Sequence, residues 1–208
     1  MYGEGFARYV DLAGAYYNKL DTLRKYYESL RLELDGAPEL GFTFKETSQN
    51  AQGRKVTTSS AATASAVDTL GQPGLTAKVN AKGAIVVEKA TKPVQDRNTK
   101  EWSYNGVNDG AMTLSFTQAT GIFKGSYTFW YDYESAFDAT KDKATMSHTS
   151  KKVSFEGIFV QGEESMRGFY LWDATGSYAD PKTSKPKTYK YKESHPVIFA
   201  GGGSDDDE

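Results

Sequence analysis

Three tryptophans and one tyrosine are the residues of this sequence best suited to hold a ligand. Their rings stand beside acidic, amide or basic residues, in "EWSYN", "FWYDY" and "YLWDA". Aromatic rings that face water next to such polar groups stack on sugar rings or anchor a protein partner. The sequence therefore predicts a surface for a glycan or a protein, built from Trp130, Trp102, Trp172 and Tyr104.

Four aspartates offer the oxygen ligands that calcium prefers. They lie in two hydrophilic segments, "DATKDK" with Asp138 and Asp142, and "DATGSYAD" with Asp173 and Asp180. Neither segment has the D-x-D-x-D-G spacing of an EF-hand loop. Aspartates in such loops more often close turns with their own backbone. We therefore expect no cofactor, with calcium at these aspartates as the weaker alternative.

Carboxylates are also the residues that a glycoside hydrolase uses as acid and nucleophile. Acidic residues that could line a cleft are Asp132, Glu134, Glu156, Glu163 and Glu164. The two histidines, His148 and His195, are far apart and form no His-x-x-His pair. The sequence contains no cysteine and no G-x-S-x-G elbow. These observations favour a non-catalytic protein and leave a carboxylate-dependent glycosidase as an alternative.

Composition and charge limit the classes of partner and compartment. The chain has 208 residues, 38% of them hydrophobic, and its apolar runs are far shorter than the roughly 20 residues of a membrane helix. The net charge is -2, which does not indicate nucleic acid. "MYGEGFARYVDL" lacks the pattern of a signal peptide. Abundant threonine, serine, glycine and tyrosine favour a module of a larger exported chain over a cytosolic protein, so we expect an extracellular or cell-surface location.

Hydrophobic spacing gives the expected elements at the two ends of the chain. Apolar residues from Phe6 to Leu30 recur every three or four positions, which predicts one amphipathic helix packed on a sheet. Alternation on both sides of "DGAP" predicts a hairpin of residues 30–34 and 40–44. We expect the helix and first strand in residues 1–36 and a β-rich module in residues 37–199. "GGGSDDDE" makes residues 200–208 a flexible acidic tail or linker.

The central and C-terminal segments predict a series of short strands. "TAKVNAKGAIVV" reads as two strands around a turn, and residues 91–110 as a long connection with a short element at Trp102 and Tyr104. "KVTTSSAATASAVDTL" is compatible with an exposed strand or a loop. The expected fold is mainly β, with nine or ten strands in a curved antiparallel sheet or small barrel and one N-terminal helix. Barrel and sandwich remain alternatives.

The segment "GIFKGSYTFWYDY" predicts which face of one strand lies in the core. Alternation places the following residues on the core face: Phe123, Gly125, Tyr127, Phe129, Tyr131 and Tyr133. Gly125 and the corresponding Gly157 predict strong coiling of the sheet or an aromatic ring over the backbone. Trp130 falls on the opposite face, where it is either exposed to a ligand or covered by the N-terminal helix.

The segments "TGIFKGSYTFWYDY", "KKVSFEGIFVQG", "GFYLWD" and "YKYKESHPV" resemble a β-rich C-terminal module of large secreted or surface bacterial proteins of the internalin-type B-repeat or Ig-like repeat kind. The resemblance covers residues 41–199 and is strongest from Leu114 to Trp172. It implies an extracellular, non-catalytic module with a structural or adhesive role in a larger parent chain. The N-terminal helix departs from the usual start of such modules. A carbohydrate-binding module that uses exposed Trp and Tyr is the first alternative.

Overall fold

The computed structural model describes residues 22–34, 37–70, 76–183 and 186–201. Almost all regular elements are strands, with two single turns of 3-10 helix, η1 (Leu23–Lys25) and η3 (Gln161–Glu163), among the described residues. The strands are β1 (Ser29–Leu34), β2 (Leu40–Gln49), β3 (Lys55–Ala64), β4 (Thr76–Val79), β5 (Ile85–Val86), β6 (Val94–Gln95), β7 (Trp102–Ser103), β8 (Thr113–Thr117), β9 (Ile122–Asp138), β10 (Lys143–Val160), β11 (Ser165–Ala179) and β12 (Pro186–Gly201).

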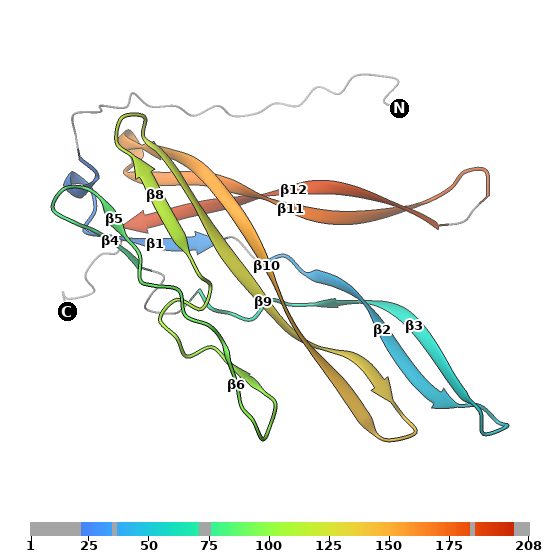
Figure 1. The fold of residues 1–208 in the computed structure, drawn as a ribbon. Helices are drawn as coiled ribbons and strands as arrows, with labels where there is room; N and C mark the ends of the chain where they lie inside the picture. Colours follow the sequence, from blue (N-terminus) through green and yellow to red (C-terminus); the bar gives the residue numbers. More distant parts are fainter. Residues whose placement is uncertain (1–21, 35–36, 71–75, 184–185, 202–208) are drawn as a thin grey trace, which may run out of the picture.

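One ten-stranded sheet dominates the molecule, in the order β3-β2-β9-β10-β11-β12-β1-β4-β5, with β8 also paired to β9. All pairs are antiparallel except β2 with β9, which run parallel over Lys45–Thr47 and Ala136–Asp138. The sheet curls strongly into a half-barrel, which brings β5 close to β8 (Figure 1). β6 and β7 form a separate two-stranded hairpin. The expectation of a mainly β, strongly curved sheet is confirmed.

Three long ribbons extend from the half-barrel (Figure 1). β2 and β3 form one, and the far ends of β9 and β10 form a second that is joined to it by the parallel pairing. We call these together the paired arm. The third, here called the β11–β12 arm, consists of residues 173–179 and 186–192 and pairs only within itself among the described residues. The two arms leave the barrel in different directions.

The core lies on the concave face of the sheet, as the alternation of β9 predicts. Phe123, Tyr127, Phe129 and Tyr131 are buried, and the half-buried Tyr133 packs on Phe42. The other strands add the following buried residues to this face: Leu30, Leu32, Ala77, Val79, Leu114, Val153, Phe155, Phe159, Met166, Tyr170, Trp172, Val197 and Phe199. The assigned core face of β9 is therefore confirmed.

Two glycines allow aromatic rings to lie against the backbone of the curled sheet. A Cβ on Gly125 would collide with the Phe155 ring and with the backbone carbonyl of Thr113. A Cβ on Gly157 would collide with the Phe123 ring and with the backbone of Gly168. Glycine at these positions removes the atom that would hold the rings away, so the prediction of a ring over the backbone is confirmed.

Two expectations near the N-terminus are wrong where the structure describes them. Residues 22–30 do not continue a helix: Leu23–Lys25 is a single 3-10 turn, and Ser29–Leu34 is strand β1. The three-and-four spacing arose because a turn followed by a strand buries Leu23, Tyr27 and Leu30 together. Residues 1–21 of the predicted helix lie outside the described residues.

The predicted hairpin of residues 30–34 and 40–44 is also wrong, because each strand has distant partners. β1 lies between β12 and β4, with Leu30 opposite Gly201, whereas β2 pairs with β3 and β9. Of the two alternatives for "KVTTSSAATA", the strand is correct. β12 continues to Gly201, so residues 200 and 201 of the expected tail are strand. Among the described residues, none forms a helix with the length and apolar character needed to cross a bilayer.

Candidate functional site

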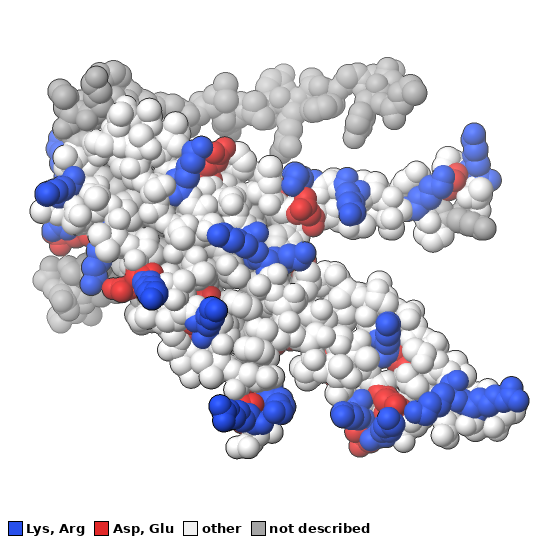
Figure 2. Space-filling model, viewed as in Figure 1, with Lys and Arg blue, Asp and Glu red and all other residues white. Residues whose placement is uncertain are grey.

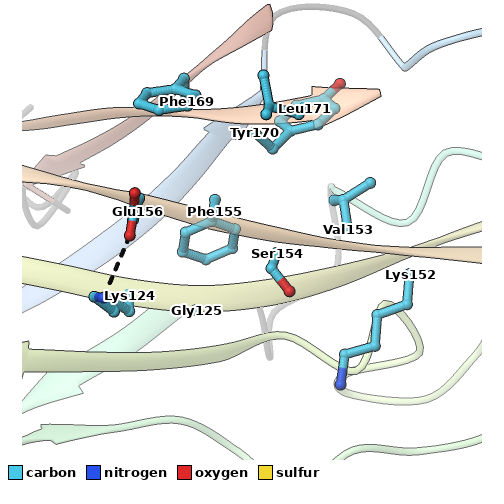
Figure 3. A pocket seen from close by; sticks show the side chains of 10 residues that line it. All are labelled: Lys124, Gly125, Lys152, Val153, Ser154, Phe155, Glu156, Phe169, Tyr170 and Leu171. Carbon is cyan, nitrogen blue, oxygen red and sulfur yellow. Dashed lines mark ion pairs between the residues drawn. The ribbon is translucent and has the colours of Figure 1, made fainter. Parts of the chain in front are cut away.

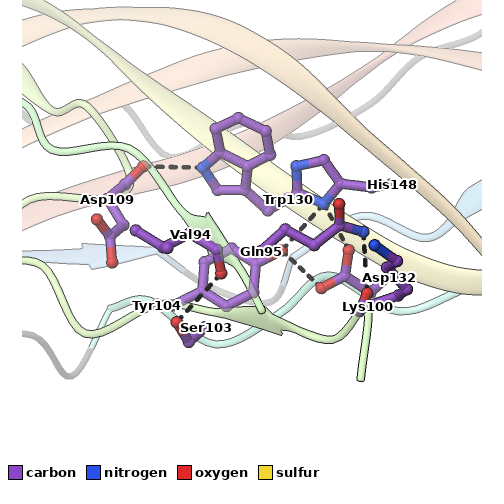
Figure 4. A network of polar contacts seen from close by, with 9 residues as sticks. All are labelled: Val94, Gln95, Lys100, Ser103, Tyr104, Asp109, Trp130, Asp132 and His148. Atoms are coloured by element: carbon purple, nitrogen blue, oxygen red, sulfur yellow. Dashed lines mark hydrogen bonds and ion pairs between the residues drawn. The ribbon is translucent and has the colours of Figure 1, made fainter. Parts of the chain in front are cut away.

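Two clusters of aromatic and charged residues stand out, one on each face of the sheet. The first lies on the convex face, where alternation along β9 and β10 places Trp130, Asp132 and His148. The β6–β7 hairpin brings Trp102 and Tyr104 to the same place. Figure 4 shows Tyr104 beside Asp132, His148 and Trp130. We call these five residues the outer stack.

The imidazole of His148 is held between two indole rings. The Trp102 ring lies parallel to it at a centroid distance of 3.6 Å, and the Trp130 ring lies nearly parallel on its other side at 4.9 Å. Its Nδ1 lies 2.6 Å from Oδ1 of Asp132. The Tyr104 hydroxyl donates to Oδ2 of Asp132 at 2.6 Å. Both faces of the imidazole and both carboxylate oxygens of Asp132 are therefore occupied.

The remaining polar contacts fasten the connection over the stack. Nε1 of Trp130 donates to the backbone carbonyl of Asp109 at 2.8 Å. The Asp109 carboxylate accepts from the Thr91 hydroxyl and from the backbone N–H of Gly106. Burial and the carboxylate of Asp132 raise the pKa of Tyr104 above its ordinary range. A histidine held in this way is suited to fastening a hairpin to a sheet.

Three of the four predicted ligand-binding aromatics thus lie together, but their contacts are with His148 and Asp132 of the same cluster. Trp102, Tyr104 and Trp130 are all partly buried and enclose His148 and Asp132. Part of the connection of residues 91–110, predicted as a loop with a short element, covers Trp130. Between the two alternatives for Trp130, the described residues show partial cover by this connection, and residues 1–21 of the predicted helix lie outside them.

The fourth predicted aromatic lies on the other face of the sheet. Trp172 is only 9% exposed, in the middle of β11, and packs against the rings of Phe129 and Tyr131. β11 continues beyond Trp172 into the β11–β12 arm. Trp172 nevertheless borders the second cluster, which is a cleft between the two arms.

This cleft has a volume of about 570 Å³, which is within the range of small-ligand sites. Its lining includes Pro38, Lys151, Trp172, Tyr191, Glu193 and His195. The buried Tyr131 hydroxyl donates to the backbone carbonyl of Pro38 at 2.8 Å and fixes the wall at the start of the paired arm. Side chains from distant parts of the chain therefore line one concave site.

Polar groups in the cleft come mainly from β12. The Tyr191 hydroxyl donates to Oε1 of Glu193 at 2.7 Å, and this bond raises the pKa of Tyr191. Oε2 of Glu193 lies 3.6 Å from Nε2 of His195, which is buried and makes no hydrogen bond with the described residues. The His195 ring stacks on Tyr170 at a centroid distance of 4.9 Å. Carboxylate, imidazole and phenol groups thus converge at the cleft.

A stripe of exposed tyrosines continues from the cleft along the β11–β12 arm. Tyr178, Tyr189 and Tyr191 are 49%, 51% and 41% exposed and share the face that forms the core nearer the barrel. The rings of Tyr189 and Tyr191 lie 5.6 Å apart, and those of Tyr178 and Tyr189 lie 6.3 Å apart. The end of the Tyr189 side chain lies over Gly176, where a Cβ would collide with it. We call these three residues the tyrosine stripe.

Sequence reasoning missed the tyrosine stripe. The signal was present as "TYKYKESH", in which every second residue is aromatic, acidic or histidine. The same alternation describes a core strand, so the pattern alone did not separate a buried face from an exposed one.

The predicted calcium ligands Asp138 and Asp180 close turns and form ion pairs. Asp138 accepts from the backbone N–H and the hydroxyl of Thr140 and lies 3.5 Å from Nζ of Lys55. Asp180 accepts from the backbone N–H of Lys182 and pairs with Lys187 at 2.6 Å. These hydrogen bonds lower the pKa of both carboxyl groups.

The other two predicted ligands lie in the β11–β12 arm and in the β9–β10 turn. Asp173 pairs with Lys192 across the β11–β12 arm at 2.8 Å, and Asp142 occupies the left-handed backbone region in the β9–β10 turn. In the part of the chain that the structure describes, no three His, Cys, Asp or Glu residues gather as metal ligands.

The predicted acidic residues of a glycosidase occupy several separate places. Asp132 belongs to the outer stack, Glu163 pairs with Arg167 at 2.8 Å, and Glu164 ends η3 in a left-handed conformation. Glu134 is exposed on β9 beyond Asp132. None of these four, nor Glu156, lines the cleft between the arms.

Glu156 instead borders a hollow of about 500 Å³ on the convex face (Figure 3). Its carboxylate pairs with Lys124 at 3.3 Å, and Phe169 and Leu171 are exposed beside it. Figure 2 shows Lys and Arg side chains distributed over the barrel and the arms, with acidic side chains beside several of them. The visible face carries no single continuous basic field.

Comparison with known proteins gave no relatives: no protein-family model, curated protein or solved structure matches the chain. The resemblance to internalin-type repeat proteins therefore stays a prediction.

Proposed function

We propose that the chain is a non-catalytic adhesive module that binds carbohydrate in the cleft between its arms. The observation that carries this proposal is the tyrosine stripe, which leads directly into a cleft with a carboxylate and an imidazole. Carbohydrate binding through exposed aromatic residues is the first alternative predicted from the sequence, but the binding residues proposed here are different ones. Tyr189, Tyr191, Glu193 and His195 replace the outer stack as the binding residues.

The chemistry of the cleft suits a sugar. The C–H face of a pyranose packs on an aromatic ring, and exposed phenol rings offer that face together with a polar edge. Sugar hydroxyls donate to carboxylates and imidazole nitrogens, and charge-assisted bonds of this kind are the stronger ones. Glu193 supplies such an acceptor within reach of Tyr191, and the partly exposed ring of His195 borders the same cleft.

The arrangement of the rings favours a linear oligosaccharide. Tyr189 and Tyr191 are two residues apart on β12, and such residues lie on the same face at intervals of roughly 6.8 Å. Tyr178 extends the row from the neighbouring strand. Several sugar units in a row would contact several rings, whereas one monosaccharide would fill only the cleft.

The adhesive part of the proposal concerns how the site is presented. The β11–β12 arm projects from the barrel, so a ligand on its tyrosine stripe stays accessible from outside (Figure 1). This suits an extracellular or surface module that holds a glycan without altering it. Incubation of bound oligosaccharide with the protein should release no shorter product.

A glycan array followed by titration calorimetry tests the proposal. We expect Tyr189→Ala and Tyr191→Ala each to weaken binding about tenfold, since a lost aromatic contact costs roughly 1.4 kcal/mol or somewhat less. Phe169→Ala is the matched control, because this exposed aromatic lies on the opposite face. Failure of every glycan to bind, or unchanged affinity in both tyrosine variants, would contradict the proposal.

A further inference from the structure

The outer edge of β3 is open along all ten residues of the strand in the described part of the chain. β3 begins the strand order and has ten residues, and among the described residues only β2 pairs with it (Figure 1). The strand at the other end of the order, β5, has two residues. An open edge presents unpaired backbone N–H and C=O groups that another strand can bind.

The β2–β3 turn tells which residues of β3 face outward. The backbone N–H of Asn50 donates to the carbonyl of Arg54 at 2.9 Å, so this opposed pair is hydrogen-bonded. Opposed pairs alternate between bonded and non-bonded in an antiparallel ladder. The non-bonded positions of β3, whose N–H and C=O point away from β2, are Lys55, Thr57, Ser59, Ala61 and Thr63.

An independent hydrogen bond supports this assignment. Thr47 is opposite Thr57, and its carbonyl accepts from the N–H of Ala139, which lies on the other side of β2. Thr47 therefore points its backbone away from β3, as a non-bonded pair requires. Thr57 does the same on the free side.

β3 lacks the features by which proteins usually protect an edge. Such features are proline, inward-pointing charge, a bulge or a very short strand. β3 has one charged residue, Lys55, at its start, no proline, and an unbroken register with β2 from Lys55 to Ala64. Its other side chains are Val, Thr, Ser and Ala, which leave little bulk on either face.

We propose that β3 pairs with β3 of a second copy of this chain, antiparallel about a two-fold axis at Ser60. In this register Thr57 faces Thr63 and Ser59 faces Ala61, so every such pair joins two outward-pointing residues. Each pair exchanges two backbone hydrogen bonds. The two Lys55 side chains lie at opposite ends of the interface and do not repel each other.

The edge favours a second copy because it is self-complementary. In a two-fold interface, if one residue contacts a second residue of the partner, the second residue must also contact the first residue of the partner. This register satisfies that condition along the strand. Pairing would also extend the paired arm into a sheet that runs through both copies. A dimer would carry two clefts, so a polymeric ligand would gain avidity without any new contact.

Sedimentation velocity over a range of concentrations is the first test, applied to the full 208-residue chain. We expect a reversible monomer–dimer equilibrium. Ala61→Pro removes an outward N–H but no β2–β3 bond, so it should weaken the dimer at least tenfold while circular dichroism stays unchanged. A chain that is monomeric at every concentration, or a dimer that Ala61→Pro leaves intact, would overturn the proposal.

Crosslinking tests the register without relying on a disruptive variant. The chain has no cysteine, so Ser60→Cys introduces a single thiol at the axis. Opposed non-bonded residues have Cα atoms about 4.5 Å apart, a separation that a disulfide can span. Ser59→Cys is the matched control, because it faces Ala61 rather than itself. Mild oxidation should crosslink the Ser60→Cys variant much faster, and equal rates for the two would overturn the register.

Discussion

The two histidines occupy comparable settings that differ in what covers them. His148 and His195 each stack on an aromatic ring and each lie beside a carboxylate. A second indole, Trp102 of the β6–β7 hairpin, closes the free face of His148. His195 has Tyr170 as its stacking partner, and its ring borders the cleft between the arms.

This difference shows that residue type does not decide between a structural cluster and a binding site. On the convex face, the connection of residues 91–110 packs against the sheet, and the tryptophans hold it in place. On the concave face the arms diverge, so that tyrosines and a carboxylate stay open to a ligand. Coverage by segments distant in the chain separates the two regions.

The largest expected effect is at a glycine in the core of the barrel. Gly125→Ala places a Cβ against the Phe155 ring and the Thr113 backbone, which cannot both move away cheaply. We expect a loss of about 3 kcal/mol in the free energy of unfolding, as for overpacked cores. Urea denaturation measures it. A loss below about 1 kcal/mol would show that the barrel relaxes around the new methyl group.

Trp102→Ala should have the next largest effect, because it removes one cover of His148. We expect the free energy of unfolding to fall by about 2 kcal/mol, less than for a fully buried tryptophan. Hydrogen exchange should accelerate in residues 91–110, and glycan affinity should stay the same. Loss of glycan binding would instead assign the binding site to the outer stack and reverse the comparison.

Alkaline titration separates the two carboxylate-bonded tyrosines. The pKa of Tyr104 is raised chiefly by burial, and that of the exposed Tyr191 chiefly by its bond to Glu193. The folded state therefore keeps a Tyr104 proton that the unfolded chain loses near pH 10, and stability must fall as the pH rises above 10. Tyr104→Phe should make this fall shallower than Tyr191→Phe does, in denaturation curves recorded at pH 9, 10 and 11.

Another buried tyrosine contributes equally to the loss of stability in the wild type and in both variants. Burial raises the pKa of the core residue Tyr127 to about 12, so it destabilises the fold over the same interval. Identical slopes in the wild type and the Tyr104→Phe variant would mean that the outer stack opens before Tyr104 ionises.

The smallest effect is expected at the glycine of the open arm. Gly176→Ala meets only the end of the Tyr189 side chain, which can swing into solvent. We expect a stability change of less than about 0.5 kcal/mol, as at exposed positions, with a measurable loss of glycan affinity. A large fall in thermal stability would show that the arm is as tightly packed as the barrel.

Local alternation in the sequence predicted much of the sheet. It gave the core face of β9, the rings over Gly125 and Gly157, and the turn between β4 and β5. It failed for β1, whose neighbours are β12 and β4, because long-range pairing leaves no local pattern. The same spacing of Leu23, Tyr27 and Leu30 fits a helix or a turn followed by a strand.

The candidate site was predictable in its residue types but not in its location. Trp102, Tyr104 and Trp130 were recognised as aromatics beside polar groups, yet their shared partner His148 belongs to another strand. The tyrosines of β12 looked like one more core face. Only the departure of the β11–β12 arm from the barrel exposes them, and that departure depends on which strands end earlier.

The antiparallel pairing of β1 with β12 has a mechanical consequence. Leu30 lies opposite Gly201, so the described chain enters β1 and leaves β12 at the same end of the barrel. A tensile load applied at these two points would peel the strands apart, with one hydrogen-bonded pair after another bearing the force alone. Such a zipper yields at lower force than a sheared pair of strands, and optical-tweezers pulling at residues 29 and 201 would measure it. The arms and the cleft lie outside the line of force and would stay folded while β1 detaches.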